Sequence, residues 1–226
     1  MKYRHEYKHI INAQDAVYLI SKLNLVMRHD NHTNEKGEYF IRSLYFDNFD
    51  NICLEEKKNG ALVHEKFRIR FYNMDPSYIM LEKKIRNNSL SHKDSTKITK
   101  EEVERIVNGD YAFLRESGDR LKMELYVKMQ NRFLRPKTIV DYMRTAFVYE
   151  VGNVRVTIDQ QIRSGMLDTS LFDTTHSSVC VDPSTIIFEV KYDAFLPDFI
   201  RDMIQLNHSQ TSSFSKYAYC RTFDNN

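Results

Sequence analysis

The chain has 226 residues, of which 33 are Lys or Arg and 31 are Asp or Glu, so its formal net charge is only +2. This balance argues against a globally basic nucleic-acid coat, while 42% hydrophobic and 28% charged residues are ordinary for a soluble globular protein. Three widely spaced cysteines, an odd number, argue against a disulfide framework and against a structural zinc site.

The first quarter of the chain predicts two strands and two helices. Residues 2–11 form the first strand, and Asn12 is a suitable N-cap for an amphipathic helix that continues to about residue 28. After a polar loop, a second strand covers residues 39–46, and a short helix over 48–58 ends before an Asn-Gly pair.

The middle of the chain predicts a hairpin, a short extended segment and a helical stretch. In chain order these elements cover residues 62–72 and 78–86 around a turn at 73–76, residues 93–98, and residues 99–132. A capping box, with Thr99 as the N-cap and Glu102 three residues later, opens the helical stretch, and Gly118 interrupts it.

The last third of the chain returns to strands. Its elements are strands over 137–149, 154–162 and 186–194, a short helix over 197–206, and a final segment over 212–223. Gly152 lies in the hairpin turn between the first two strands. Residues 165–185 are rich in Ser, Thr and Asp and predict a long mobile loop.

This order of elements predicts the fold class. We expect a single domain over residues 1–226, of the α+β class, mostly antiparallel and with helices packed on the outside. No stretch approaches the ~20 apolar residues of a membrane span, and the N-terminus lacks the apolar core of a signal peptide. We therefore expect a cytoplasmic protein with reduced thiols, while attachment to a membrane-protein partner stays open.

Positive side chains occur at alternate positions of several predicted strands. They are Arg68 and Arg70, Lys84 and Arg86, Arg144, Arg155 and Lys191. Alternate residues share one face of a strand, so these cations would line one interior if the strands close into a barrel. The alternative is a solvated outer face, which is common in antiparallel sheets. Crowded cations in a reduced dielectric repel one another, and a polyanion would offset this repulsion, so the pattern indicates phosphate binding.

Acidic residues among these cations indicate a metal ion. A carboxylate would repel a phosphate unless a cation lies between them, and Mg²⁺ or Mn²⁺ typically binds one or two carboxylates together with phosphate oxygens. Glu189 is the best candidate ligand, and Glu6 and Glu82 are weaker ones. The alternative for each is a local ion pair, with Lys191, Lys8 and Lys84 respectively.

A set of short motifs carries a family resemblance. The motifs are Arg4-His5-Glu6-Tyr7-Lys8, Arg68-Ile69-Arg70, Glu82-Lys83-Lys84, Tyr142-Met143-Arg144-Thr145, Arg155, Glu189-Val190-Lys191 and Ser213-Phe214-Ser215-Lys216-Tyr217. Their order resembles the VTC domain, the polyphosphate polymerase branch of the triphosphate tunnel metalloenzymes in the CYTH-like superfamily. Each motif is short, but the ordered set covers essentially the whole chain.

The resemblance implies an antiparallel tunnel barrel of about eight strands that binds ATP and polyphosphate with Mn²⁺ or Mg²⁺. The VTC branch moves the γ-phosphate of ATP onto a growing polyphosphate chain. By matching motifs, the expected catalytic cations are Arg68, Arg70, Lys84, Arg144, Arg155 and Lys216. The expected further phosphate ligands are Lys8, Lys83, Lys93, Tyr142, Lys191 and Ser215, with Lys97 as the alternative to Lys93. Glu189 is the expected metal ligand.

Arg4 departs from the general superfamily pattern, which has two glutamates and a lysine at alternate positions. Here Arg4 takes the first position and leaves only Glu6 and Lys8. Loss of a carboxylate argues against the interpretation as a two-metal hydrolase, because water activation generally needs a base or a second metal ion. We therefore expect transfer to a phosphate acceptor, in a stand-alone bacterial catalytic domain without the membrane segment of fungal relatives.

Three other functions stay open. They are an inorganic triphosphatase or nucleotide hydrolase on the same fold, a non-catalytic sensor of polyphosphate or inositol polyphosphates, and RNA binding through Phe71, Tyr72 and Tyr78. Aromatic residues at such positions more often belong to a core or barrel wall, so we expect no nucleic-acid partner. Residues 165–185 are a candidate lid over one mouth of the tunnel.

Overall fold

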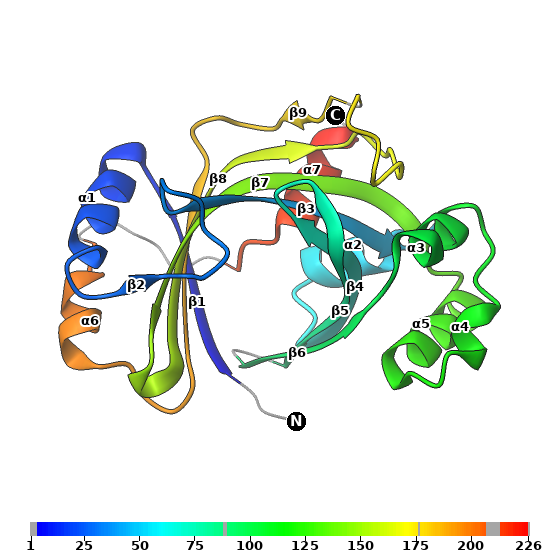
Figure 1. The fold of residues 1–226 in the computed structure, drawn as a ribbon, viewed down its shortest axis with the longest axis horizontal. Helices are drawn as coiled ribbons and strands as arrows, with labels where there is room; N and C mark the ends of the chain where they lie inside the picture. The colour runs from blue at the N-terminus through cyan, green and yellow to red at the C-terminus, as the bar shows by residue number, and fades with distance from the viewer. Residues whose placement is uncertain (1–3, 88–89, 176, 207–212, 226) are drawn as a thin grey trace.

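The strands form one closed antiparallel barrel, shown in Figure 1. The computed structural model describes residues 4–87, 90–175, 177–206 and 213–225. The barrel strands are β1 (Arg4–Ile11), β3 (Glu38–Asp47), β4 (Val63–Tyr72), β5 (Asp75–Asn87), β6 (Leu90–Lys97), β7 (Arg135–Tyr149), β8 (Val154–Ser164) and β10 (Ile186–Tyr192). They pair in the order β7-β3-β4-β5-β6-β1-β10-β8, and pairing of β8 with β7 closes the ring. The α+β class and the barrel expected from the sequence are confirmed.

The helices lie outside the barrel. Two of them, α1 (Ala13–Leu23) and α6 (Asp198–Met203), lie on one side, and α3 (Lys100–Val107), α4 (Phe113–Glu116) and α5 (Arg120–Asn131) lie on the opposite side (Figure 1). Near each other, α2 (Ile52–Lys58) and α7 (Lys216–Asp224) contact β3, β4, β7 and β8. The short strands β2 (Arg28–His29) and β9 (Val179–Cys180) pair with β7 and β8, and the 3₁₀ turn η1 (Val151–Asn153) joins those two long strands.

Two hydrophobic cores lie between the barrel wall and these helices. The larger core includes Leu44 and Ile69 on β3 and β4, and the smaller one includes Val156, Phe188 and Leu19 under α1. Successive residues of a strand point to opposite faces, so the residues that alternate with these apolar side chains face the barrel interior. Burial of the outer face under helices therefore directs the polar face of each strand inward.

Local signals in the sequence fix where several helices begin. The side chain of Asn12 accepts a hydrogen bond from the backbone N–H of Asp15 at 2.8 Å, and the capping box of α3 is complete. The first helix ends at Leu23, earlier than the predicted residue 28. The predicted helical stretch over 99–132 is interrupted at Gly109 as well as at Gly118, where positive φ angles of 86° and 69° end a helix.

The turn of the β4–β5 hairpin is tighter than predicted. Only Asn73 and Met74 lie outside the strands, both with positive φ, as a two-residue hairpin turn with matching twist requires. The strand β5 therefore begins at Asp75, inside the expected turn over 73–76. Residues 2, 3 and 212 of the predicted elements lie outside the described residues.

The described part of the segment 165–185 contacts the outer wall of the barrel. Leu171 is buried in the larger core, and the ring of Phe172 packs on Phe71 with their centroids 5.5 Å apart. The carbonyl of Asp173 accepts a hydrogen bond from Arg42 at 3.0 Å. None of the described residues of this segment lines the barrel interior. Apolar side chains within this polar segment thus anchor part of it to the core, while its expected mobility and its role as a lid stay predictions.

Candidate functional site

The barrel encloses a cavity of about 450 Å³ whose wall is dominated by cations. Among the described residues, thirteen of those that line it are Lys or Arg, and three are Glu. The cations are Arg4, Lys8, Lys57, Lys66, Arg68, Arg70, Lys84, Arg86, Lys93, Arg144, Arg155, Lys191 and Lys216, and the acids are Glu6, Glu82 and Glu189. The interior therefore concentrates positive charge in a chain that is almost neutral as a whole.

Strand β4 shows how the sequence produces this wall. Its alternate residues His64, Lys66, Arg68, Arg70 and Tyr72 all line the cavity. The residues between them point to the helices or to the outer surface, because a strand presents successive side chains to opposite faces. One strand thus contributes a row of three cations with a ring at each end.

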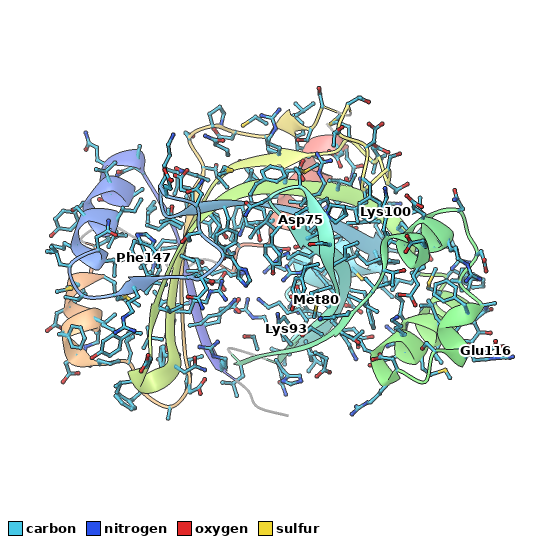
Figure 2. All side chains as sticks on the ribbon, viewed as in Figure 1. Asp75, Met80, Lys93, Lys100, Glu116 and Phe147 are labelled. Atoms are coloured by element: carbon cyan, nitrogen blue, oxygen red, sulfur yellow. The ribbon has the colours of Figure 1, made fainter. Side chains whose placement is uncertain are left out.

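Twelve of the thirteen predicted site residues line the cavity. The exception is Lys83, whose neighbour Lys84 takes the inward position on β5. Lys83 points outward, where its ammonium contacts Glu65 at 2.9 Å and also Glu124 on α5. The expectation that Lys83 binds phosphate in this interior is therefore wrong. The choice between Lys93 and Lys97 is also settled in position: Lys93 lies on the inner side of β6 (Figure 2) and Lys97 is not a lining residue.

Glu82 is the anion at the centre of one group of cations. Its carboxylate lies 2.6 Å from Arg68, 2.6 Å from Lys93 and 4.0 Å from Arg70. Burial alone would raise the pKa of Glu82, but these three positive charges hold the pKa well below its usual value. The local pair with Lys84, offered by the sequence as the alternative role for Glu82, is not formed.

Glu6 is the centre of a second group. Its carboxylate lies 2.7 Å from Lys84, 3.2 Å from Lys8 and 3.7 Å from Lys191, and it accepts a hydrogen bond from the hydroxyl of Ser91 at 3.0 Å. These contacts join β1 to β5, β6 and β10. The expected local pair of Glu6 with Lys8 therefore exists, but as one contact among several.

Asp159 is the centre of a third group and was missed by the sequence analysis. It is fully buried on β8, accepts two hydrogen bonds from Arg144 at 2.6 and 2.7 Å, and lies 2.5 Å from Lys216. It thus ties a barrel strand to the first residue of α7. Asp159 shares a face of β8 with Arg155, because the two residues are four positions apart. Following the same face for two more alternate residues from Arg155 would have identified Asp159.

Tyr142 holds three of the cations in place. Its hydroxyl accepts a hydrogen bond from Arg70 at 2.8 Å, and its ring lies 5.3 Å from the guanidinium of Arg144 and 4.7 Å from the ammonium of Lys216. Ser43 accepts a further hydrogen bond from Arg70 at 2.9 Å. The guanidinium of Arg70 is therefore fixed by hydrogen bonds to neutral partners, and its one nearby carboxylate among the described residues, Glu82, lies 4.0 Å away, which leaves donors available to a ligand.

Lys66 is a lining cation that the sequence analysis missed. Its ammonium donates a hydrogen bond to Ser215 at 3.2 Å and lies 5.2 Å from the ring of Tyr217, and burial lowers its pKa. The start of α7 is held against β3, because the hydroxyl of Tyr217 donates a hydrogen bond to the buried carboxylate of Asp47. The signal for Lys66 was its place one alternate position before Arg68.

Glu189 is the buried cavity carboxylate that could hold a divalent cation, although lysines surround it. It lies on β10 with only 4% of its surface exposed, and its Oε1 forms an ion pair with the ammonium of Lys191 but accepts no hydrogen bond of good geometry from the described residues. Burial and the charge of Glu6 act to raise the pKa of Glu189, but nearby lysines lower it to about 2. The described residues contain no cluster of three or more His, Cys, Asp or Glu side chains. The site thus fits one hard ion that takes most of its ligands from phosphate oxygens.

Comparison with known proteins places this chain in one family. The family model for the VTC domain matches residues 3–223. No relative was found among curated proteins. Across the described residues, every helix is too short or too polar to cross a membrane.

Solved structures with low sequence identity share the fold. A candidate adenylate cyclase from Bacillus halodurans is 15% identical, and the match covers 91% of this chain and 88% of that one with a TM-score of 0.51. A protein from Pyrococcus horikoshii is 11% identical, with 89% and 85% covered and a TM-score of 0.45. A candidate adenylate cyclase from Vibrio parahaemolyticus is 10% identical, with 89% and 84% covered and a TM-score of 0.43. At these identities the first likeness supports the fold alone.

Proposed function

This chain belongs to the VTC domain family, and we propose that it is an ATP-dependent polyphosphate polymerase. In this proposal residues 1–226 form a single tunnel domain in the cytoplasm, where ATP is available. The γ-phosphate of ATP is transferred to the end of a polyphosphate chain held in the same cavity. The observation that supports the proposal best is the enclosed interior, in which thirteen Lys or Arg residues face three Glu residues.

The charge balance of the cavity favours a polyanionic ligand. Burial lowers the pKa values of Lys66, Lys84 and Lys93, so keeping these ammonium groups charged in the interior has a free-energy cost. Phosphate oxygens would offset that cost by charge-assisted hydrogen bonds, each of which contributes about 1.5–3 kcal/mol. A triphosphate or polyphosphate carries enough charges to contact several of these groups at once.

The chain's own residues suffice to position the two substrates for transfer. Phosphoryl transfer has a loose transition state, so catalysis depends on alignment and on stabilisation of spread charge. The guanidinium groups of Arg68, Arg70 and Arg144 suit phosphate oxygens in pairs, and the lysines provide point charges. A terminal oxygen of the acceptor forms the new bond to the γ-phosphorus, the bond from that phosphorus to the β–γ bridging oxygen breaks, and ADP leaves. A Mn²⁺ or Mg²⁺ ion held by Glu189 would neutralise further phosphate charge.

The state of the cavity carboxylates favours transfer over hydrolysis. Glu6, Glu82 and Glu189 each contact Lys or Arg, and these contacts lower their pKa values. Carboxylates with lowered pKa values are weak bases for activating water. The terminal oxygen of polyphosphate is already an anion and needs no base.

Incubation of the purified protein with ATP and Mn²⁺ tests the proposal. We expect ADP and phosphate chains that lengthen with time, measured by sizing the product on a gel. Orthophosphate as the sole phosphate product would identify a nucleotide hydrolase or triphosphatase instead. Tight binding of polyphosphate without any turnover would identify a sensor.

The adjacent residues Lys83 and Lys84 provide a matched pair of variants. We expect Lys84→Ala to weaken binding of inorganic triphosphate at pH 7 by about tenfold or more, because one charge-assisted contact is lost. Lys83→Ala should change that affinity by less than about twofold, because its ammonium lies outside with Glu65 and Glu124. Isothermal titration calorimetry measures both affinities. An equal loss in the two variants would contradict the assignment of the inner face.

The ammonium of Lys84 should also make triphosphate binding depend on pH. Burial, together with Lys8 and Lys191, lowers the pKa of Lys84 to about 7, although the carboxylate of Glu6 opposes this shift. A bound polyanion favours the charged form and raises that pKa, so binding takes up a proton above pH 7 and weakens as the pH rises. Calorimetry at pH 8 without metal, in buffers of different ionisation enthalpy, should show this uptake. The uptake should be absent in Lys84→Arg, and its persistence there would assign it to another group.

A further inference from the structure

The two ends of the cavity differ in chemistry. His64 and Tyr72 lie at opposite ends of the inward-facing row of β4, and both line the cavity. They are eight positions apart in sequence, which corresponds to about 26 Å along a strand. A ligand that is itself asymmetric would therefore have one preferred orientation.

The end near His64 is basic. Arg86 pairs with His64 across the β4–β5 ladder, and Lys57 reaches the same end from α2, outside the strands. Burial lowers the pKa of Lys57 to about 8, and the charges of Arg86, Lys66 and Lys8 add to this effect. Cations from a helix and three strands thus converge where a phosphate chain would meet them.

The end near Tyr72 is aromatic. The ring of Tyr72 is stacked on the exposed ring of His32, with centroids 5.6 Å apart and planes inclined by only 5°. The ring of Tyr39 meets Tyr72 edge-on at 5.9 Å, and its hydroxyl accepts a hydrogen bond from Arg155 at 2.8 Å. The guanidinium of Arg155 in turn lies 2.6 Å from Asp30. A pair of stacked rings therefore adjoins the nearest cation of the cavity wall.

We propose that the stacked rings of Tyr72 and His32 bind the base of the donor nucleotide. This inference rests on the proposed function and adds an orientation to it. The parallel contact with His32 shows that the face of Tyr72 accepts a planar ring, and base–aromatic stacking is strong enough to orient a nucleotide. The phosphates then extend past Arg155 toward the basic end, and the acceptor chain occupies the part of the cavity near Lys57. The ligand of the aromatic end is therefore a nucleoside. A purine base, which has a larger ring system than a pyrimidine, should stack there more strongly.

Binding of ATP and of inorganic triphosphate to Tyr72→Ala tests this assignment. We expect the variant to bind ATP about tenfold more weakly, since a stacked base contributes about that factor, and to bind inorganic triphosphate within about twofold of the wild-type affinity. Tyr72→Phe should keep both affinities, because it retains the ring. Tyr18→Ala, which removes an exposed ring on α1, is the matched control and should change neither. Calorimetry without metal and a thermal melt of each variant provide the measurements.

The two ligands separate failure of this inference from failure of the proposed function. If Tyr72→Ala loses affinity for ATP and triphosphate equally, or for neither, the base does not bind at the aromatic end. If the wild-type protein binds triphosphate but not ATP, the proposed use of ATP is wrong. A wild-type protein that makes polyphosphate from ATP while Tyr72→Ala keeps full ATP affinity overturns only the orientation of the nucleotide in the cavity.

Discussion

Replacement of Arg70 by alanine should lower the rate of phosphoryl transfer at least about 1,000-fold while the barrel stays folded. The side chain is 4% exposed, and Ser43 and Tyr142 fix its guanidinium before any substrate binds. Groups fixed in this way stabilise transition-state charge without reorganisation, and loss of one such donor or arginine costs about 10² to 10⁵ in rate. Initial rates of ADP release at saturating ATP measure the effect. Arg70→Lys should recover only part of it, since a lysine lacks the paired donors.

The fold should tolerate this change because the neighbouring carboxylate keeps its partners. Without Arg70, Glu82 still contacts Arg68 and Lys93 at 2.6 Å each. We therefore expect a Tm within about 4 °C of wild type, which corresponds to about 1 kcal/mol for a chain of this size.

Lys216→Ala should also lower the rate of transfer while the barrel stays folded. The fold should tolerate the change because the buried Asp159 keeps its two hydrogen bonds from Arg144. Arg105→Ala, which removes an exposed arginine of α3 paired with Asp110, is the control and should retain full activity. Wild-type turnover in both Arg70→Ala and Lys216→Ala would refute the tunnel model.

The alternation of charge along the strands was enough to predict the inner face of the barrel. Arg68 and Arg70 share one face of β4, so both lie inside once the sheet closes and helices cover its apolar face. The same rule reaches Lys66 and Asp159, which were missed because the alternation was not extended beyond Arg68 and Arg155. Positions fixed by strand period are therefore predictable from sequence alone.

Positions that depend on distant neighbours were not predictable. In the Glu82-Lys83-Lys84 run either lysine could face inward, and the register of β5 against β4 and β6 decides between them. The partner of Glu82 was also predicted wrongly, because Arg68 and Lys93 lie on adjacent strands and the sequence shows only the nearby Lys84. Lys57 lies on a helix, where strand alternation gives no signal. These contacts arise from closure of the sheet, which is a property of the whole chain.

Glu189→Gln should lower transfer about 100-fold and remove its dependence on Mn²⁺. The amide keeps the shape of the side chain but loses the charge that a divalent ion requires, and it leaves the ammonium of Lys191 with Glu6 alone at 3.7 Å. Rates measured against Mn²⁺ concentration should rise for the wild-type protein and stay flat for the variant. Glu116→Gln, on the exposed end of α4 (Figure 2), is the control and should keep the wild-type response.

Glu6→Gln provides the contrast that assigns the metal to one carboxylate. Three ammonium groups and the hydroxyl of Ser91 already surround Glu6, whereas Glu189 forms an ion pair with one ammonium, that of Lys191, and its Oε1 accepts no hydrogen bond from the described residues. Because its partners occupy Glu6, we expect that it does not bind the metal ion. Loss of its charge should change the affinity for triphosphate and leave unchanged the Mn²⁺ concentration that gives half-maximal rate. If Glu6→Gln instead abolishes the response to Mn²⁺ and Glu189→Gln preserves it, the metal ligand lies on β1, and the lysines that now hold Glu6 must move to phosphate when the ion binds.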